Sequence, residues 1–380
     1  MQHEPVISAL EGVAPLMPTP CGTVISGPGL SSTVAAFIGA RVWPQLVHIH
    51  PASLNETFSR SLTRLMIVSI AAARCDDMGS RRNTMNTITP CLWFNGNAED
   101  AVQFYTTAFS DSSIVDTTRY PSEGLADFQQ DLAGAVLTVT FRLAGQDFLA
   151  INAGERFAFN ESTSFMVNFD PSTDPDARRN LDALWNALID GGSALMPIAN
   201  YDFSPRYGWL RDRFGVNWQL ILTDPAGEPR PTIMPALMFG DGVQNRAREA
   251  IEFYASVFDN AQLGADVRYT ERTGPAHPGS VMFGDVRLRD RWFVAMDAAT
   301  RKHVTFTESV SFVIPCADQA EIDRYWAALS AVPEAEACGW CKDKFGVSWQ
   351  ITPANIDELM KRPNAFEHMM QLKKIEIAKL

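Results

Sequence analysis

The residues with the clearest chemical potential lie in a stretch that occurs twice, DRFGVNWQLI at 212–221 and DKFGVSWQIT at 343–352. Each copy places an Asp before a turn glycine and a Gln in the strand that follows. An Asp at that position more often caps the turn than acts as a base. The amide oxygen of Gln can accept a hydrogen bond or ligate a metal ion, but it brings no charge. The stretch therefore predicts hydrogen bonding and identifies no catalytic residue.

Two cysteines form the sequence Cys338-Gly339-Trp340-Cys341, and a C-x-x-C spacing can be a redox dithiol. The repeat argues against that interpretation, because the counterparts of the two cysteines are Tyr207 and Leu210, inside a predicted strand. Positions i and i+3 of a strand point to opposite faces. We expect two buried or edge thiols.

The other elements also recur. ITPCLWF (88–94) is matched by IMPALMF (233–239), and the helical pattern AEDAVQFYTTAF (98–109) by REAIEFYASVF (248–258). Apolar residues alternate in the strands and follow a helical period in the helices, so each copy predicts two β-α-β-β-β units. The offset between the copies falls from 149 at Tyr105 and Tyr254 to 131 at Phe214 and Phe345. Copy one is therefore longer in its late loops.

The repeat divides the chain into parts. We expect a poorly ordered extension at 1–84, which has no counterpart in the repeat. Upstream extension and misplaced start codon are the favoured interpretations, and a transit peptide near 54–82 is a third, against which the acidic residues Glu56, Asp76 and Asp77 count. The predicted parts that follow are a first domain at 86–224, a Pro/Gly-rich linker at 225–232, a second domain at 233–353 and a helical tail at 354–380.

Composition limits the partners. The net charge of -12 and pI near 5.0 argue against nucleic acid, whose binding needs a basic face, and against an anionic membrane surface. No apolar run reaches the ~18 residues of a membrane span. Six scattered cysteines predict a reduced, cytoplasmic setting.

A pair of β-α-β-β-β units per copy, with a helix ending in FY and a last strand preceded by D-x-F-G, resembles the vicinal oxygen chelate superfamily of glyoxalases, bleomycin-resistance proteins and dioxygenases. ITPCLWFNGNAEDAVQFY, DRFGVNWQ and MMQLKKIEIAKL look like its PhnB-like branch, labelled 3-demethylubiquinone-9 3-methyltransferase. The resemblance covers 86–380. It implies an α+β fold of two tandem domains, each a cupped mixed sheet with helices outside and ligand in the concavity. One chain would then make a pseudo-dimer that single-domain relatives build by dimerising, with a homodimer of the whole chain also open.

The resemblance also implies where a metal ion would sit, through His and Glu on the first, fourth, fifth and eighth strands. Pro90 and Pro235 match the first-strand position, Ser164 and Ser311 the fifth, and Gln219 and Gln350 the eighth. We therefore expect no metal, with His277 and His303 as loop residues. No Gly-rich turn after a strand is present to bind S-adenosylmethionine, and Gly240-Asp241-Gly242 is a lone loop pair, so no cofactor is expected.

Strand parity from these ligand positions places Pro90, Leu92 and Phe94 in one cup with Asn217, Gln219 and Ile221, while Trp218 and Trp349 pack under the helices. The residues expected to bind ligand are Phe94, Trp209, Asn217, Gln219, Phe239, Trp340, Ser348 and Gln350. An apolar cavity with neutral amides suits a small, partly apolar molecule.

The sequence predicts a metal-free small-molecule-binding protein. The alternative is an enzyme, either the methyltransferase of the label or a lyase or dioxygenase with a weak metal site. A third possibility is that one domain is only a structural partner of the other. Trp209 and Trp340 could close the cup mouths or pack at an edge.

Overall fold

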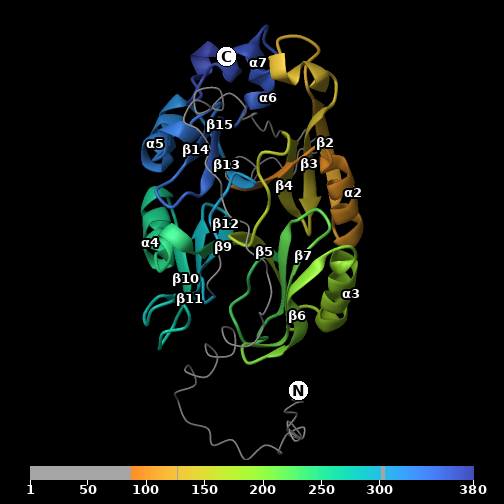
Figure 1. Cartoon of the computed structure of the whole chain (residues 1–380), viewed down its shortest axis with the longest axis vertical. Helices are drawn as coiled ribbons and strands as arrows, with labels where there is room; N and C mark the ends of the chain where they lie inside the picture. The colour runs from red at the N-terminus through yellow and green to blue at the C-terminus, as the bar shows by residue number, and fades with distance from the viewer. Residues whose placement is uncertain (1–86, 126, 301–303) are drawn as a thin grey trace, which may run out of the picture.

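The structure, a computed structural model, describes residues 87–125, 127–300 and 304–380. The predicted extension 1–84 and His303 lie outside the described residues. Figure 1 shows the described chain as two sheets with helices along two sides. No helix in this part of the chain is long and apolar enough to cross a membrane.

Copy one folds into two β-α-β-β-β units. The first consists of β1 (Thr89–Phe94), α2 (Ala98–Ala108), β2 (Ser113–Arg119), β3 (Val136–Leu143) and β4 (Gln146–Asn152). The second consists of β5 (Thr163–Phe169), α3 (Ala177–Ile189), β6 (Ser193–Tyr201), β7 (Ser204–Arg211) and β8 (Asn217–Leu222). The alternating and helical periods in the sequence thus predicted the element order of this copy.

Copy two follows the same order with one strand fewer. Its first unit is β9 (Ile233–Phe239), α4 (Ala247–Val257), β10 (Gln262–Arg268), β11 (Val281–Leu288) and β12 (Arg291–Asp297). Its second is β13 (Val310–Cys316), α5 (Gln319–Leu329), β14 (Trp340–Lys342) and β15 (Ser348–Pro353). Where copy one has β6, the shorter copy two has the 3-10 helix η6 (Pro333–Ala335).

The remaining elements are short. The tail carries the helices α6 (Ile356–Leu359) and α7 (Ala365–Met370) and the 3-10 turn η7 (Ile377–Lys379), and two further 3-10 helices are η4 (Asp127–Leu132) and η5 (Asp241–Val243). The tail lies beside α5 at the end of the molecule that holds β14 and β15 (Figure 1).

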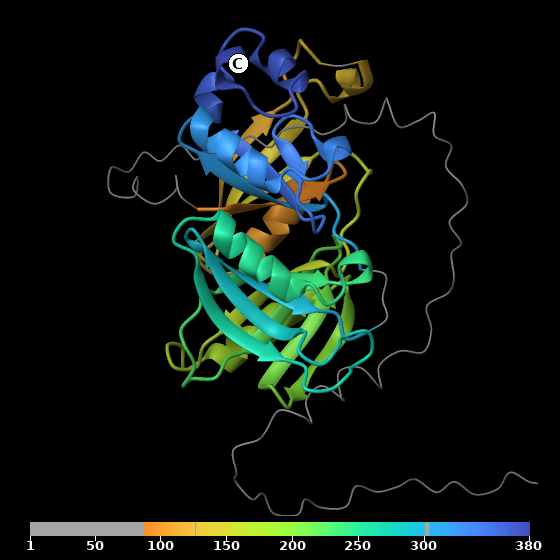
Figure 2. The ribbon, with the colours of Figure 1, turned by 90° about the vertical axis from the view of Figure 1, so that its left-hand side faces the viewer.

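Each sheet is built from both copies. The seven-stranded sheet has the order β14-β15-β13-β1-β4-β3-β2, and the eight-stranded sheet has the order β10-β11-β12-β9-β5-β8-β7-β6. The joints are the antiparallel pairs β1–β13 and β5–β9. The first unit of each copy therefore shares a sheet with the second unit of the other copy, as the upper and lower halves of Figure 2 show.

This exchange corrects the predicted grouping of residues into cups. Phe94 lies in the seven-stranded sheet, whereas Asn217 and Gln219 lie in the eight-stranded sheet, so they do not share a concave face. The short connection 223–232 explains why the second unit of copy one shares a sheet with the first unit of copy two. It joins β8 to β9, which both neighbour β5, and two strand spacings of ~4.8 Å each are easily bridged by a few extended residues.

The predicted face of the first strand is also wrong by one residue. Pro90 pairs with Phe312, whose ring contacts Trp349 in the helix-covered core. Pro90, Leu92 and Phe94 therefore face the helices, because alternate residues of a strand share a face. The equivalent residues of strand β9 also face the helices, and its Phe239 contacts Phe345 in the core.

The helices of one copy lie together, with α2 and α3 on one side of the molecule and α4 and α5 on the other (Figure 1). Between helices and sheets lies the main core. Trp218 and Trp349 are fully buried in it, which confirms their predicted position beneath the helices. Trp218 contacts Tyr105 of α2 and Phe109, the residue that follows this helix.

A buried carboxylate ties the two sheets together in each copy. Asp212 caps its turn by accepting from the backbone N–H groups of Phe214 and Val216. Its other oxygen accepts from the Tyr105 hydroxyl and the Trp218 indole, both at 2.8 Å. Tyr105 belongs to α2 over the seven-stranded sheet and Trp218 to the eight-stranded sheet, so one carboxylate holds both.

Copy two repeats this arrangement with the sheets interchanged. Asp343 accepts from Phe345 and Val347 N–H, from the Tyr254 hydroxyl at 2.7 Å and from the Trp349 indole at 2.9 Å. Burial raises the pKa of both carboxyls above the usual 3.8, against the opposing effect of these hydrogen bonds. The interpretation of the repeated Asp as a turn cap is confirmed.

Asp343→Ala should lower the free energy of unfolding by about 3 kcal/mol or more, because four donors lose their acceptor inside the core. Urea denaturation of the full chain measures the loss. Asp131→Ala, at an exposed position, is the matched control and should change stability by less than about 0.5 kcal/mol. Equal losses in the two variants would contradict the assigned role of Asp343.

Candidate functional site

The concave face of the eight-stranded sheet carries no helix and is rich in methionine and aromatic side chains. One buried cluster joins Met166, Met234, Ala236 and Val294, and a second joins Leu195, Tyr207 and Trp209. Ile221 packs against both clusters, so the two form one continuous surface. Thioethers adapt their shape to what they contact, which suits a binding surface.

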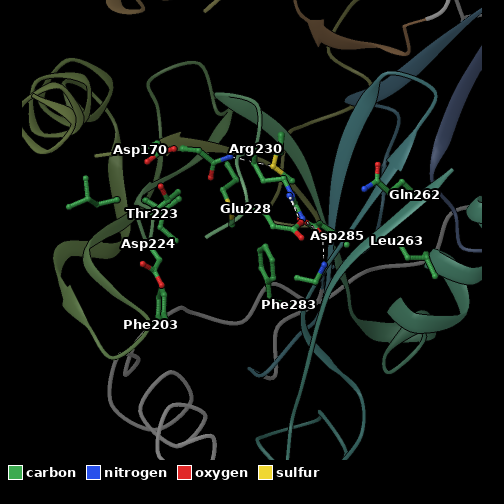
Figure 3. Close-up of a pocket in the computed structure, with 17 residues that line it drawn as sticks. Asp170, Phe203, Thr223, Asp224, Glu228, Arg230, Gln262, Leu263, Phe283 and Asp285 are labelled. Atoms are coloured by element: carbon green, nitrogen blue, oxygen red, sulfur yellow. Dashed lines mark hydrogen bonds and ion pairs between the residues drawn. The ribbon is translucent and has the colours of Figure 1, made fainter. Parts of the chain in front are cut away.

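A cavity of about 480 Å³ opens at one end of this face (Figure 3). Its lining residues come from β5, β8, the connection between the copies, β9, β10 and β11, and include Phe203 of the β6–β7 turn. Met166, Ile221, Met234 and Phe283 supply apolar walls. The size falls within the range of roughly 300–1,000 Å³ typical of small-molecule sites.

One wall of the cavity is an ion pair held in a fixed position. Nε of Arg230 donates to Oδ2 of Asp285 at 2.7 Å, and the guanidinium carbon lies 4.0 Å from the ring centroid of Trp292. Asp285 also accepts from the Ala265 N–H at 2.6 Å. Gly264 makes room for this packing, because a Cβ there would lie 1.9 Å from Oδ1 of Asp285.

The predicted polar residue Gln219 lies on the same concave face beyond the cavity. Its Nε2 donates to the Ser164 hydroxyl at 2.8 Å, and its Oε1 accepts from the Tyr207 hydroxyl at 2.7 Å. Trp209 pairs with Gln219 on the adjacent strand. Asn217, at the start of β8, donates to the carbonyl groups of Asn160 and Gly215.

The seven-stranded sheet holds the equivalent residues of copy two. Gln350 donates to the Ser311 hydroxyl at 2.9 Å, as Gln219 does to Ser164. Its Oε1 and the Ser348 hydroxyl are buried, and within the described residues neither has a hydrogen-bond partner. The counterpart of Tyr207 in the repeat is Cys338, so the hydroxyl that satisfies Gln219 is missing here. Trp340 is buried edge-to-face against Trp93.

The eight residues predicted to bind ligand therefore separate into three places. Trp209, Asn217 and Gln219 lie on the eight-stranded sheet, Trp340, Ser348 and Gln350 on the seven-stranded sheet, and Phe94 and Phe239 in the core against the helices. None of them lines the 480 Å³ cavity. Their role in binding stays a prediction.

The positions matched to metal ligands do not fit a metal ion. On the eight-stranded sheet, Ser164 lies opposite Ala236, which itself pairs with Val294. Ala236 replaces Pro235 as the first-strand residue on this face, and neither Ala236 nor Val294 offers a ligand atom. Both ends of the Gln219 amide are hydrogen-bonded within the protein. An amide is also neutral, so Gln219 supplies neither an anionic oxygen nor an imidazole nitrogen to a metal ion.

Residues elsewhere in the described chain do not supply a metal site either. No group of three or more His, Cys, Asp or Glu side chains there could hold an ion. His277 is exposed in a loop, as predicted. Cys338 and Cys341 are buried free thiols, and burial raises the pKa of Cys338 to about 12, which disfavours a reactive thiolate.

An adenosyl group does not fit the glycine pair. Gly240 precedes the 3-10 helix η5, which contains Gly242, and neither glycine lines the cavity. The adenosyl-binding sites of doubly wound methyltransferases need a parallel sheet with a Gly-rich turn. Both sheets here join their two units through antiparallel pairs instead.

The sequence interpretation missed the residues that form the cavity. Asp285 is a charged residue inside the apolar strand VMFGDVRL, and Arg230 is the basic residue of the linker PAGEPRP. A charge in the middle of a buried strand needs a partner. The sequence could therefore have identified Asp285 as a residue of interest. Its partner was not recoverable, because 55 residues separate the pair.

Several solved structures resemble parts of the chain. The PhnB protein from Bacillus cereus is 35% identical over 36% of this chain and 98% of its own, with a TM-score of 0.30, and a Staphylococcus aureus protein is 33% identical over 36% and 96%, with a TM-score of 0.15. Glyoxalase I from Zea mays is 12% identical over 73% and 95%, with a TM-score of 0.44. None of the curated proteins matches the sequence.

The sequence model of the family described as 3-demethylubiquinone-9 3-methyltransferase matches two separate regions, residues 86–221 and 231–352. These regions coincide with the two copies of the repeat, and together they cover most of the described chain. The predicted duplication and glyoxalase-like fold are thereby confirmed. The chain belongs to the 3-demethylubiquinone-9 3-methyltransferase family, as a tandem member with two PhnB-like copies.

Proposed function

We propose that this chain is a metal-free protein that binds a small, partly apolar molecule on the concave face of the eight-stranded sheet. The observation that carries the proposal is the 480 Å³ cavity, whose walls combine methionine and phenylalanine side chains with a fixed Arg230–Asp285 pair. Apolar walls provide the affinity of such a site, and a few oriented polar groups provide its selectivity.

The concave face continues from the cavity toward Gln219 and Trp209 through Ile221, which packs against both clusters. A larger ligand would extend along this surface and meet the predicted residues there. The set Trp340, Ser348 and Gln350 would serve the other sheet in the same way. The buried oxygens of Gln350 and Ser348, which have no hydrogen-bond partner among the residues that the structure describes, support that role, because a buried hydroxyl or amide without a partner costs about 1–3 kcal/mol.

The two aspartates that the repeat singles out are not placed for catalysis. Asp212 and Asp343 are each held by four hydrogen bonds inside the core, and neither lines the 480 Å³ cavity. General acid–base catalysis needs a titratable group within hydrogen-bond reach of a substrate. The cytoplasmic setting expected from the sequence stays a prediction, and a homodimer of the whole chain stays an open alternative.

Purified full-length protein should hold far less than one divalent ion per chain after mild dialysis, because the ligand positions on the eight-stranded sheet offer hydroxyl, amide and aliphatic groups and the described residues contain no cluster of three or more His, Cys, Asp or Glu side chains that could hold an ion. Elemental analysis measures the content. In parallel, calorimetric titration with S-adenosylmethionine at high micromolar concentration should release no heat. A tightly held ion at one per chain, or saturable S-adenosylmethionine binding, would overturn the metal-free, non-methyltransferase function.

Ile221→Trp should weaken the binding of the neutral probe 2-naphthylmethanol by about tenfold or more, because the larger ring fills cavity space; tenfold corresponds to about 1.4 kcal/mol. Probe fluorescence measures the affinity. Ile114→Trp, at an exposed position on β2 of the other sheet, is the control and should leave it unchanged. Equal affinities in the two variants would place the probe outside this cavity.

A further inference from the structure

The cavity is strongly acidic as well as apolar. Four carboxylates line it, from Asp170, Asp224, Glu228 and Asp285, and a single guanidinium, from Arg230, so the lining has a formal charge of -3. In Figure 3, Asp170 and Asp224 lie on one side of the cavity, and Asp285 and Phe283 lie on the other. Asp285 is buried, Asp170 is half-buried, and Asp224 and Glu228 are exposed at the mouth of the cavity.

The one basic side chain is already committed. Arg230 is only 16% exposed, and its donors reach Asp285 at 2.7 Å and Glu228 at 3.1 Å. Its guanidinium carbon also lies 4.0 Å from the ring centroid of Trp292. The bond to Asp285 is the largest effect that raises the pKa of Arg230, so the guanidinium stays charged. Arg230 is therefore held by its neighbours and does not offset the acids on the other side.

Those acids retain capacity for a partner. Asp170 accepts the N–H of Ser172 with one oxygen, and Asp224 accepts the N–H of Ala226 with one oxygen. Within the described residues, neither carboxylate takes part in an ion pair. Each can accept from a ligand with its second oxygen.

The rest of the lining suits the body of an organic cation. Met166 and Met234 form an adaptable floor, and Phe203 and Phe283 present aromatic rings. An aromatic face attracts a cation within about 6 Å of its centroid. Phe203 is 41% exposed, although a large apolar side chain gains from burial, so an arriving ligand can cover it. The aromatic rings and the free carboxylate oxygens favour the same class of molecule independently.

We propose that the ligand of this cavity is a small organic monocation with an apolar body, such as a substituted ammonium ion. The apolar body lies on the methionine floor against Phe283, and the ammonium group donates to Asp224 and Asp170. This inference rests on the proposed function and gives its ligand a chemical class. The chain's net charge of -12 favours the approach of such a ligand at low ionic strength.

Three probes that share a naphthalene body test the inference on the full-length chain: the cation 2-naphthylmethylammonium, the neutral 2-naphthylmethanol and the anion 2-naphthoate. Calorimetric titration should give the cation about tenfold higher affinity than the alcohol, with the anion weakest. The advantage of the cation should shrink as salt is added, because screening weakens the attraction of exposed carboxylates.

Substitutions locate the effect. Asp224→Asn combined with Asp170→Asn should remove most of the advantage of the cation and leave the affinity for the alcohol unchanged. Glu367→Gln, at an exposed position on α7, removes a charge far from the cavity and should change neither affinity. Because all three positions are partly or fully exposed, the variants should fold.

The outcomes separate the two proposals. Equal affinities for the three probes would overturn the cation inference and leave the binding function standing. Binding of none of them would overturn both. A cation advantage that survives the double substitution would show that the charge is recognised elsewhere, and would overturn the assignment to this cavity.

Discussion

A buried carboxylate before the last strand of each copy organises the molecule. Asp212 and Asp343 each cap their own turn and also accept from a tyrosine and a tryptophan that belong to different sheets. The tyrosine comes from the first helix of the copy and the tryptophan from its last strand. The two units of each copy are thereby joined on their helix-covered sides. The free edges of their first strands pair with the other copy, β1 with β13 and β5 with β9.

The two concave faces are unequal because the two copies differ in sequence. Both contain a Gln that donates to a Ser hydroxyl, yet only Gln219 has a tyrosine for its oxygen. The linker adds a larger difference, because it exists once and places Arg230 against Asp285 on the eight-stranded sheet only. The fusion of two copies into one chain thus supplies a wall of the cavity that two separate copies would lack.

The sequence predicted the local structure well. The two periods gave the strands and helices, and the repeat placed Trp218 and Trp349 in the core, because both signals depend on neighbours close in the chain. Which strand edges meet was not predictable in this way: β1 can pair equally well with either copy as far as its own alternation is concerned. The face predicted for Phe94 and Phe239 was wrong because the alternation of each strand was counted from Pro90 or Pro235. These prolines lie one residue away from the positions that face the concave side.

The cavity could not be predicted from the sequence because its walls join residues of seven segments, and its ion pair spans 55 positions. A crystal structure of the full chain grown with a 2-naphthylmethyl ligand tests the account most directly. We predict density for the naphthalene between Met234 and Phe283 on the eight-stranded sheet, with Arg230 still on Asp285. Density on the concave face of the seven-stranded sheet alone, or strands paired within each copy, would contradict it.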